Sequence, residues 1–180
     1  LAAHLRDHPE QPLADIAFTL KEGRRAFEKR MVVVAETHDE AAALLEEANP
    51  RRVHQHTALA KPDVAFLFPG GGAQYAGMAR DLYETEPVFA DWMDRGLDHL
   101  ATITDTDMRA LWLPAERDRP GADAALTKPS LQLPLIMIVE YALAQLWMSW
   151  GITPKALAGH SMGENTAACV AGVMSFEDCI

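Results

Sequence analysis

The sequence predicts an α/β protein made of two units, a small α+β unit over residues 1–61 and an α/β unit over residues 62–180. Short apolar runs typical of strands alternate with segments of helical periodicity. A polar stretch at residues 54–62 separates the two sets of elements. The chain has 180 residues, 49% of them hydrophobic, which is enough to bury one core and a small companion unit.

The first unit has a helix–strand–helix pattern. Three segments show the periodicity of regular elements: a helix at residues 13–20, a buried strand at residues 31–35 and a helix at residues 41–47. Gly23 ends the first helix. Thr37 and Glu40 have the spacing of a capping box, so they mark the start of the second helix, which Asn49 and Pro50 end. Residues 54–62 are then expected to form a linker.

The second unit begins with a strand and contains one long apolar helix. Its expected elements are a strand covered on both faces at residues 64–68, a glycine-rich turn at residues 69–74, helices containing Met78 to Leu82 and Pro87 to Met93, a central helix at residues 134–150 and a short strand at residues 156–160. Residues 102–127 are expected to be mostly loop with short helical turns. The long apolar stretch could also span a membrane, but Glu140 and Gln145 favour a buried helix.

Charge and cysteine content exclude several classes of function. The chain has 16 Lys and Arg against 26 Asp and Glu, a formal charge of −10. That sign argues against a nucleic-acid partner and against an anionic membrane surface. Cys169 and Cys179 lack the spacing of a metal site or a disulfide framework, so we expect no metal. Two buried free thiols fit a reducing, cytoplasmic location.

The segment Gly159-His160-Ser161-Met162-Gly163 has the G-x-S-x-G pattern between a short strand and a helix. In a nucleophile elbow this context exposes the serine hydroxyl on a tight turn, and the flanking glycines let the backbone pass close to neighbouring elements. The amide of Met162, at the start of the helix, would stabilise a developing oxyanion. Ser161 is therefore the candidate nucleophile; an ordinary tight turn is the alternative.

The glycine-rich turn Pro69-Gly70-Gly71-Gly72-Ala73-Gln74 is a second candidate part of this site. Consecutive glycines let backbone N–H groups converge where a side chain would block them, which would complete an oxyanion hole. A nucleotide-phosphate loop is one alternative, but the turn lacks both Gly-Lys-Ser/Thr and the G-x-G-x-x-G register. A merely tight turn is the other.

Three ordered motifs resemble those of the acyltransferase domain in type I polyketide synthases. They are Phe68 to Gln74, Leu131 to Leu143, and Gly159 to Glu164. Residues 1–61 resemble the linker domain between the ketosynthase and that acyltransferase. The resemblance thus implies a ketosynthase-acyltransferase linker followed by the first part of an α/β-hydrolase-like acyltransferase core.

The resemblance also implies a ping-pong reaction. The serine takes a malonyl-type group from acyl-CoA and hands it to the phosphopantetheine arm of an acyl carrier protein. It makes Ser161 the nucleophile, the backbone amides of Gly71 and Met162 the oxyanion donors, and Gly159, His160 and Gly163 the support of the elbow. No cofactor is bound by such a domain. Its partners are acyl-CoA, acyl carrier protein and the neighbouring ketosynthase.

The sequence departs from the family pattern in three respects. Gly71 stands where glutamine is usual, which spares the main-chain donor and removes only a side-chain contact. Leu133 likewise stands where many members have glutamine. The family's general-base histidine and its carboxylate-binding arginine both follow the serine motif and are not found here, so we expect the 180-residue chain alone to be inactive.

The remaining histidines have no local catalytic pattern, and His160 is expected to serve in structural packing. Two other classes of function stay open at the level of the sequence. One is a serine esterase or thioesterase, which shares the elbow but transfers the acyl group to water. The other is a non-catalytic scaffold fragment that packs between larger domains.

Overall fold

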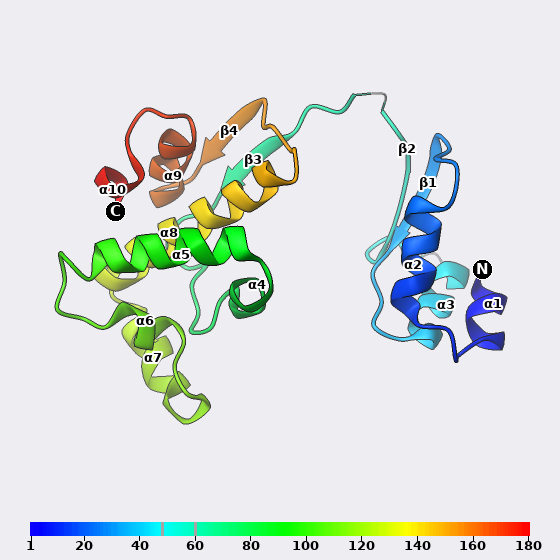
Figure 1. Ribbon diagram of the computed structural model, residues 1–180, viewed down its shortest axis with the longest axis horizontal. Helices are drawn as coiled ribbons and strands as arrows, with labels where there is room; N and C mark the ends of the chain where they lie inside the picture. Colours follow the sequence, from blue (N-terminus) through cyan, green and yellow to red (C-terminus); the bar gives the residue numbers. More distant parts are fainter. Residues whose placement is uncertain (48, 60) are drawn as a thin grey trace. The chain divides into compact units, whose positions relative to one another are not determined.

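The computed structural model describes residues 1–47, 49–59 and 61–180. The chain divides into two compact units, Leu1–Pro62 and Asp63–Ile180 (Figure 1). Each unit contains a two-stranded sheet, antiparallel in the first and parallel in the second. The two strand pairs therefore belong to separate packing units.

The first unit combines helices with the antiparallel pair. Its elements, in chain order, are α1 (Ala2–Asp7), α2 (Leu13–Glu22), β1 (Lys29–Val33), α3 (His38–Glu47) and β2 (Val53–Thr57). α1 packs against α3, where Leu5, Ala41 and Ala42 form a small buried cluster. Apolar contact between these two helices is the main source of burial in this unit.

The capping box before α3 is confirmed in part. Thr37 Oγ1 accepts a hydrogen bond from the N–H of Glu40 at 3.2 Å. The Glu40 carboxylate, however, accepts from the N–H of Glu36 at 2.9 Å. The return bond thus reaches the residue before Thr37, and it still satisfies a donor near the helix start.

Two predictions for the first unit are wrong. β1 begins two residues before the predicted strand, and its side chains are mostly exposed. Residues 54–57, predicted to belong to a linker, lie in β2, which pairs with β1 from Lys29↔Thr57 to Val33↔Val53. An antiparallel pair forms through backbone hydrogen bonds, so a strand whose side chains face solvent needs no apolar pattern.

The second unit surrounds a parallel strand pair with helices. Its elements are β3 (Ala65–Phe68), α4 (Arg80–Thr85), α5 (Pro87–Leu100), α6 (Met108–Trp112), the 3₁₀ turn η1 (Glu116–Asp118), α7 (Arg119–Ala125), α8 (Pro129–Ser149), β4 (Ala156–Gly159), α9 (Met162–Val170) and α10 (Phe176–Cys179). β3 and β4 pair in register from Ala65↔Ala156 to Phe68↔Gly159. The segments that follow the two strands therefore leave the sheet at the same edge.

Three details of this unit correct the predictions. β3 is not covered on both faces in the structure, because the Leu67 side chain is 75% exposed. Residues 102–127 contain the expected short helical turns, α6, η1 and α7, but these fill more than half of the segment, so it is not mostly loop. α8 begins at Pro129 rather than Pro134, and Pro129 occupies the first helical turn, where proline costs no hydrogen bond.

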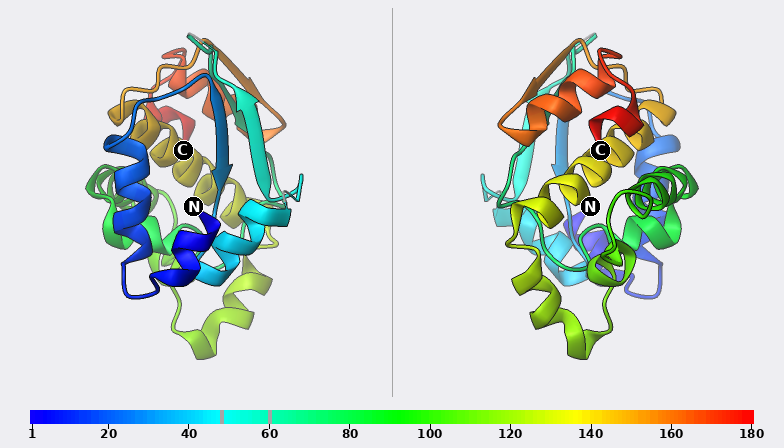
Figure 2. Two further views of the ribbon diagram at one scale, coloured as in Figure 1. Left: turned by 90° about the vertical axis from the view of Figure 1, so that its right-hand side faces the viewer. Right: turned by 90° about the vertical axis from the view of Figure 1, so that its left-hand side faces the viewer.

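α8 is the central helix of the second unit and packs against α5 and α9 (Figure 2). Its buried residues Leu135, Met137 and Ile138 share a core with Phe89 and Met93 of α5. Among the described residues, α8 is the one helix long and apolar enough to cross a membrane, and half of its apolar window is buried inside the protein. The prediction of a buried helix is confirmed for the faces that contact α5 and α9.

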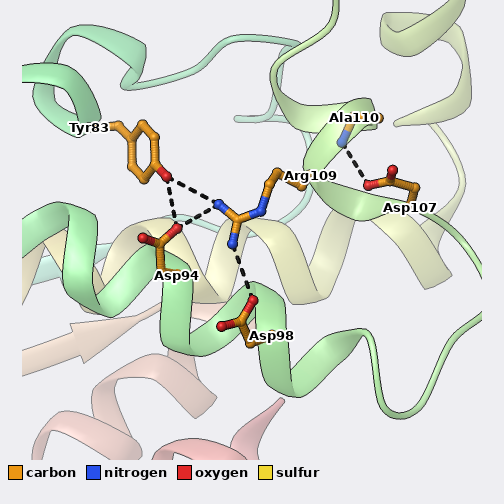
Figure 3. Close-up of polar contacts among 6 residues, drawn as sticks. All are labelled: Tyr83, Asp94, Asp98, Asp107, Arg109 and Ala110. Carbon is orange, nitrogen blue, oxygen red and sulfur yellow. Dashed lines mark hydrogen bonds and ion pairs between the residues drawn. The ribbon is translucent and has the colours of Figure 1, made fainter.

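A polar network links α4, α5 and α6 (Figure 3). The Arg109 guanidinium donates to Asp94, to the Tyr83 hydroxyl at 3.1 Å and to Asp98 at 3.2 Å. Asp107 caps α6 by accepting from the N–H of Ala110 at 2.9 Å. The hydrogen bond to Asp94 raises the pKa of Arg109. Arg109 pairs with both Asp94 and Asp98, so these ion pairs link α5 and α6.

Candidate active site

The G-x-S-x-G segment forms the turn between β4 and α9. Ser161 has φ 56° and ψ −120°, and Met162, the next residue, begins α9. A positive φ is uncommon for a residue with a side chain, and among the described residues only Ala79 shares it. The Ser161 side chain is exposed. The turn therefore presents the hydroxyl at the N-terminus of a helix, which is the geometry of a nucleophile elbow.

The glycines on either side of Ser161 are required by close packing of the backbone. A Cβ on Gly159 would lie 2.1 Å from the carbonyl carbon of Gly163. A Cβ on Gly163 would lie 2.1 Å from the carbonyl oxygen of Phe68, at the end of β3. Neither position has room for any side chain, so the spacing of these two glycines is what allows α9 to approach β3 and β4.

The glycine-rich turn passes directly against Ser161. The N–H of His160 donates to the carbonyl oxygen of Phe68 at 3.0 Å, which extends the parallel pairing by one bond. A Cβ on Gly70 would lie 2.9 Å from the Cβ of Ser161 and 2.8 Å from the carbonyl oxygen of His160. The two predicted motifs are thus brought together at the edge where β3 and β4 end.

Two main-chain N–H groups in these motifs have no hydrogen-bond acceptor among the described residues. In the part of the chain that the structure describes, neither the N–H of Gly71 nor that of Met162 donates to a backbone or side-chain group. Their neighbours differ: the N–H of Gly72 donates to Gln74 Oε1 at 2.8 Å, and the N–H of Gly163 to the carbonyl oxygen of His160 at 3.0 Å. An oxyanion hole requires main-chain N–H groups that are free to donate to a substrate oxygen.

The motif at residues 131–143 also reaches this site. A Cβ on Gly71 would lie 3.1 Å from Gln132 Oε1 and 3.5 Å from Leu133 Cδ2, both at the start of α8. The Gln132 side chain donates to the carbonyl oxygen of Thr127 at 3.1 Å. All three sequence motifs therefore converge, and the side chain missing at Gly71 would have pointed toward Gln132.

His160 lies beside the glycine-rich turn. Its backbone bonds to Phe68 and to Gly163, and the residue as a whole is exposed. Its ring nitrogen Nδ1 would lie 3.2 Å from a Cβ on Gly70, so the ring borders that turn, and its role in packing stays a prediction. No hydrogen bond joins the Ser161 hydroxyl to a histidine or a carboxylate among the residues the structure describes.

The sequence did not predict a buried polar pair beneath the elbow. Glu140 of α8 is 7% exposed, and its Oε2 accepts a hydrogen bond from the Oγ1 of the fully buried Thr166 of α9 at 2.6 Å. Burial raises the pKa of Glu140 to about 7, and the hydrogen bond from Thr166 opposes that rise. The signal available in the sequence was a lone acidic residue inside an apolar helix.

A cavity of about 630 Å³ lies over β3 and α8, not at the elbow. Its lining includes Phe66, Tyr75, Val139, Glu140 and Trp147, and does not include Ser161. The lining also includes Pro69 and Ala73 of the glycine-rich turn, so the cavity borders the candidate site without reaching Ser161.

The cysteines and potential metal ligands form no second site. Burial raises the pKa of Cys169 to about 12. Cys179 is partly buried, and both thiols are free. Within the ranges 1–47, 49–59 and 61–180, no three His, Cys, Asp or Glu side chains are grouped so that they could hold a metal ion.

A serine on a strand-to-helix turn, at the N-terminus of a helix, is an arrangement found in proteins that form acyl-serine intermediates. Residues 65–180 match the family described as "Acyl transferase domain", and residues 1–45 match "CurL-like, PKS C-terminal". The chain belongs to the acyl transferase domain family of modular type I polyketide synthases.

Relatives and solved structures agree with this assignment. The chain is 40% identical over 181 residues to erythronolide synthase EryA2 of Saccharopolyspora erythraea, covering 98% of the chain and 5% of that protein. It is 38% identical to polyketide synthase GfsB of Streptomyces halstedii, covering 93% of the chain and 3% of that protein. The acyl transferase domain of ZmaA superposes with a TM-score of 0.85 at 36% identity, over 99% of this chain and 41% of that one. The mixed helix and strand fold is thus that of polyketide synthase acyltransferase domains.

A more distant structure matches a smaller part of the chain. The malonyl CoA-acyl carrier protein transacylase from Clostridium perfringens superposes with a TM-score of 0.55 at 25% identity, over 66% of this chain and 34% of that one. The chain thus spans less than half of each of these solved domains and a few per cent of the synthases.

Proposed function

We propose that Ser161 takes a malonyl-type group from acyl-CoA and passes it to the phosphopantetheine arm of an acyl carrier protein. One observation carries the proposal. Ser161 stands at positive φ between β4 and α9, with Gly70 of the glycine-rich turn close to it, and the N–H groups of Gly71 and Met162 have no acceptor among the described residues. The membership of the chain in the acyl transferase domain family supports the choice of reaction.

The reaction has two balanced halves. In the first, Ser161 Oγ attacks the thioester carbonyl, the carbon–sulfur bond breaks, and the hydroxyl proton passes through a base to the departing coenzyme A thiolate. In the second, the phosphopantetheine thiol attacks the ester carbonyl, the carbon–oxygen bond breaks, and Ser161 regains a proton. The base is the histidine that the family carries after the serine motif.

The main chain supplies electrostatic stabilisation in both halves. The N–H groups of Gly71 and Met162 donate to the oxyanion of each tetrahedral intermediate, and the N-terminus of α9 adds the favourable end of a helix dipole. Gly159, His160 and Gly163 hold the elbow in shape. No cofactor takes part, and acyl-CoA is a substrate.

We extend the proposal to the arrangement of the whole polypeptide. The first unit is assigned as a ketosynthase-acyltransferase linker, supported by the family match over residues 1–45, and the neighbouring ketosynthase is its partner. The second unit is assigned as the first part of an α/β-hydrolase-like core, supported by the parallel pair that ends in the elbow. The protein acts in the cytoplasm, without nucleic acid or membrane.

The test is acylation of the native polypeptide by malonyl-CoA. We expect mass spectrometry of the peptide that contains Ser161 to show one added malonyl group, and Ser161→Ala to abolish it. Adding the acyl carrier protein should move the group onto its phosphopantetheine arm faster than water removes it. Acylation that persists in Ser161→Ala would overturn the assignment of the nucleophile, and release to water alone would make the protein a thioesterase.

A further inference from the structure

Beneath the elbow lies a carboxyl group that the proposed chemistry does not use. Glu140 and Thr166 are buried polar side chains in the described part of the protein, and they bond to each other at 2.6 Å. Their helices also pack together directly. The remaining oxygen, Glu140 Oε1, is buried and has no partner among the described residues. A hydrogen bond in such apolar surroundings is strong, and its loss is costly.

The hydrogen bond acts on the helix that begins at the nucleophile. Thr166 follows Ser161 by five residues, a rise of roughly 7 Å along the helix axis. α9 has 9 residues, so a rotation at Thr166 is transmitted to its first turn, where the Met162 N–H lies. The first turn is itself held by the close approach of Gly163 to the carbonyl oxygen of Phe68. α9 is therefore fixed at two points, one on β3 and one on α8.

Among the described residues, no charged side chain bonds to Glu140. The helices packed against α8 are α5, α6 and α9. Titratable side chains occur on each of these helices and at Tyr141, the residue after Glu140 in α8. Those on the three helices are Asp91, Asp94, Arg95, Asp98, His99, Arg109, Glu164 and Cys169. None of these side chains forms a hydrogen bond or an ion pair with Glu140 among the described residues, whereas Thr166 does form a hydrogen bond with it. The contact with Thr166 is thus the specific polar interaction of this carboxyl.

We propose that Glu140 is a positioning residue: through its hydrogen bond with Thr166 it sets the orientation of α9, and thereby the placement of Ser161 and the Met162 N–H for acylation. This inference rests on the proposed function only where malonyl-CoA is named as the acyl donor. The orientation of Ser161 can be tested without that assumption, with a reagent that reacts with the serine directly.

The first test removes the hydroxyl from the native polypeptide. Thr166→Val keeps the shape of the side chain and deletes the donor. We expect it to lower the kcat for malonyl-CoA about tenfold and to change KM less than twofold, because misplacement of a reacting group raises the barrier without altering ground-state binding. Thr166→Ser restores the donor and should recover kcat to within about threefold.

The matched control separates positioning from packing. Val139 adjoins Glu140 on α8 and is 7% exposed, so Val139→Ala loosens the same region without touching the hydrogen bond. We expect Val139→Ala to lower the melting temperature and to leave kcat within about twofold of the native value. An equal loss of kcat in Val139→Ala and Thr166→Val would overturn the proposal, as would a native kcat in Thr166→Val.

The second test examines the pair. Glu140→Leu should reproduce the loss of kcat seen in Thr166→Val, and the double variant should be no slower than either single variant, because one interaction can be removed only once. Glu140→Gln retains an acceptor and should stay within about threefold of native. Independent, multiplying effects of the two single substitutions would contradict a shared role.

A fluorophosphonate probe tests the positioning role of Glu140 separately from the proposed function. It phosphonylates the serine oxygen with loss of fluoride, whatever acyl donor the protein uses. If malonyl-CoA fails to acylate Ser161 but labelling of Ser161 slows about tenfold in Thr166→Val, the donor is wrong and the positioning role stands. If malonyl-CoA acylates Ser161 and both rates are unchanged in Thr166→Val, the positioning role is wrong and the proposed function stands.

Discussion

The two glycine-containing segments at the end of the parallel pair are held in different ways. In the elbow, Cβ atoms on Gly159 and Gly163 would lie 2.1 Å from backbone atoms. In the glycine-rich turn, only Gly70 meets such a barrier; a Cβ on Gly71 would face the flexible Gln132 side chain, and one on Gly72 would face open space. The elbow is thus fixed by main chain on both sides, whereas the turn is anchored at one residue. Substitutions should therefore have graded effects.

The largest effect is expected for Gly163→Ala. Alanine in place of glycine normally stabilises a helix by about 1 kcal/mol. Here the new methyl group meets the Phe68 carbonyl oxygen at 2.1 Å, and neither backbone segment can yield without separating α9 from β3. We expect a net loss of about 3 kcal/mol or more in the free energy of unfolding, together with loss of Ser161 acylation.

Gly121→Ala is the matched control for that substitution. Gly121 also lies in a helix, α7, but a Cβ there meets nothing within 4 Å. We expect it to raise the melting temperature slightly, since only the helix propensity changes. Equal stability of the two alanine variants by calorimetry would show that the elbow is not constrained by Phe68.

The second effect is a pH dependence of the free energy of unfolding. It arises at Glu140, which bonds to the helix that follows the elbow, and it has no counterpart in the glycine-rich turn. Burial raises the pKa of Glu140 from 4.5 to about 7, so the folded protein binds this proton more tightly than the unfolded chain. Protonation of Glu140 therefore stabilises the folded state. This stabilisation has its full value below pH 4.5, decreases as the pH rises toward 7, and is absent above pH 7. Its size is on the order of 3 kcal/mol.

Glu140→Gln tests this dependence, because the amide does not titrate. The variant should lose less stability than the native protein between pH 5 and pH 8 when thermal unfolding is compared in matched buffers. Parallel curves for the two proteins would mean that Glu140 is ionised in the folded state at both pH values.

The third effect concerns Gly70, the anchored residue of the turn. Gly70→Ala would place a methyl group 2.9 Å from the Cβ of Ser161, which must move or push the turn away. We expect a loss of about 2 kcal/mol in stability and about a hundredfold in the rate of Ser161 acylation. Retained acylation would indicate that the turn and the elbow can separate without consequence for the site.

The smallest effect is expected at Gly71. Gly71→Ala puts a methyl group 3.1 Å from Gln132 Oε1, at the end of a flexible side chain that can shift by a few tenths of an ångström. Because the proposed donor is the main-chain N–H, stability should change by less than about 0.5 kcal/mol and acylation by less than about threefold. A tenfold loss would show that the Gln132 contact positions the N–H.

How far the sequence anticipates the fold depends on whether an element has a buried face. β3, β4, α5 and the elbow were predicted because apolar runs, a proline start and the glycine spacing mark them. β2 was missed because its residues 54–57 are polar and exposed, and its pairing with β1 uses only the backbone. The start of α8 was misplaced because the segment holds two prolines, and either could begin a helix.

The same limit applies to the site. The position of Ser161 between a strand and a helix follows from the order of local elements, and the glycines beside it follow from local sterics. The exposure of His160 and the pairing of Glu140 with Thr166 do not follow from the local sequence. Each depends on which elements pack against each other in the folded protein. Glu140 carried a signal, as a lone acid among apolar residues, but its partner lies 26 residues away.

By itself the sequence determined the elbow. A serine between two glycines, after a short apolar run and before a helix, adopts that turn because short-range steric repulsion restricts its backbone. Only the tertiary structure decided what stands around it. The register Phe68↔Gly159 places Gly70 against Ser161, and the packing of α8 on α9 removes Glu140 from water. Strand pairing and desolvation are set by surfaces distant in sequence, so no local pattern specifies them.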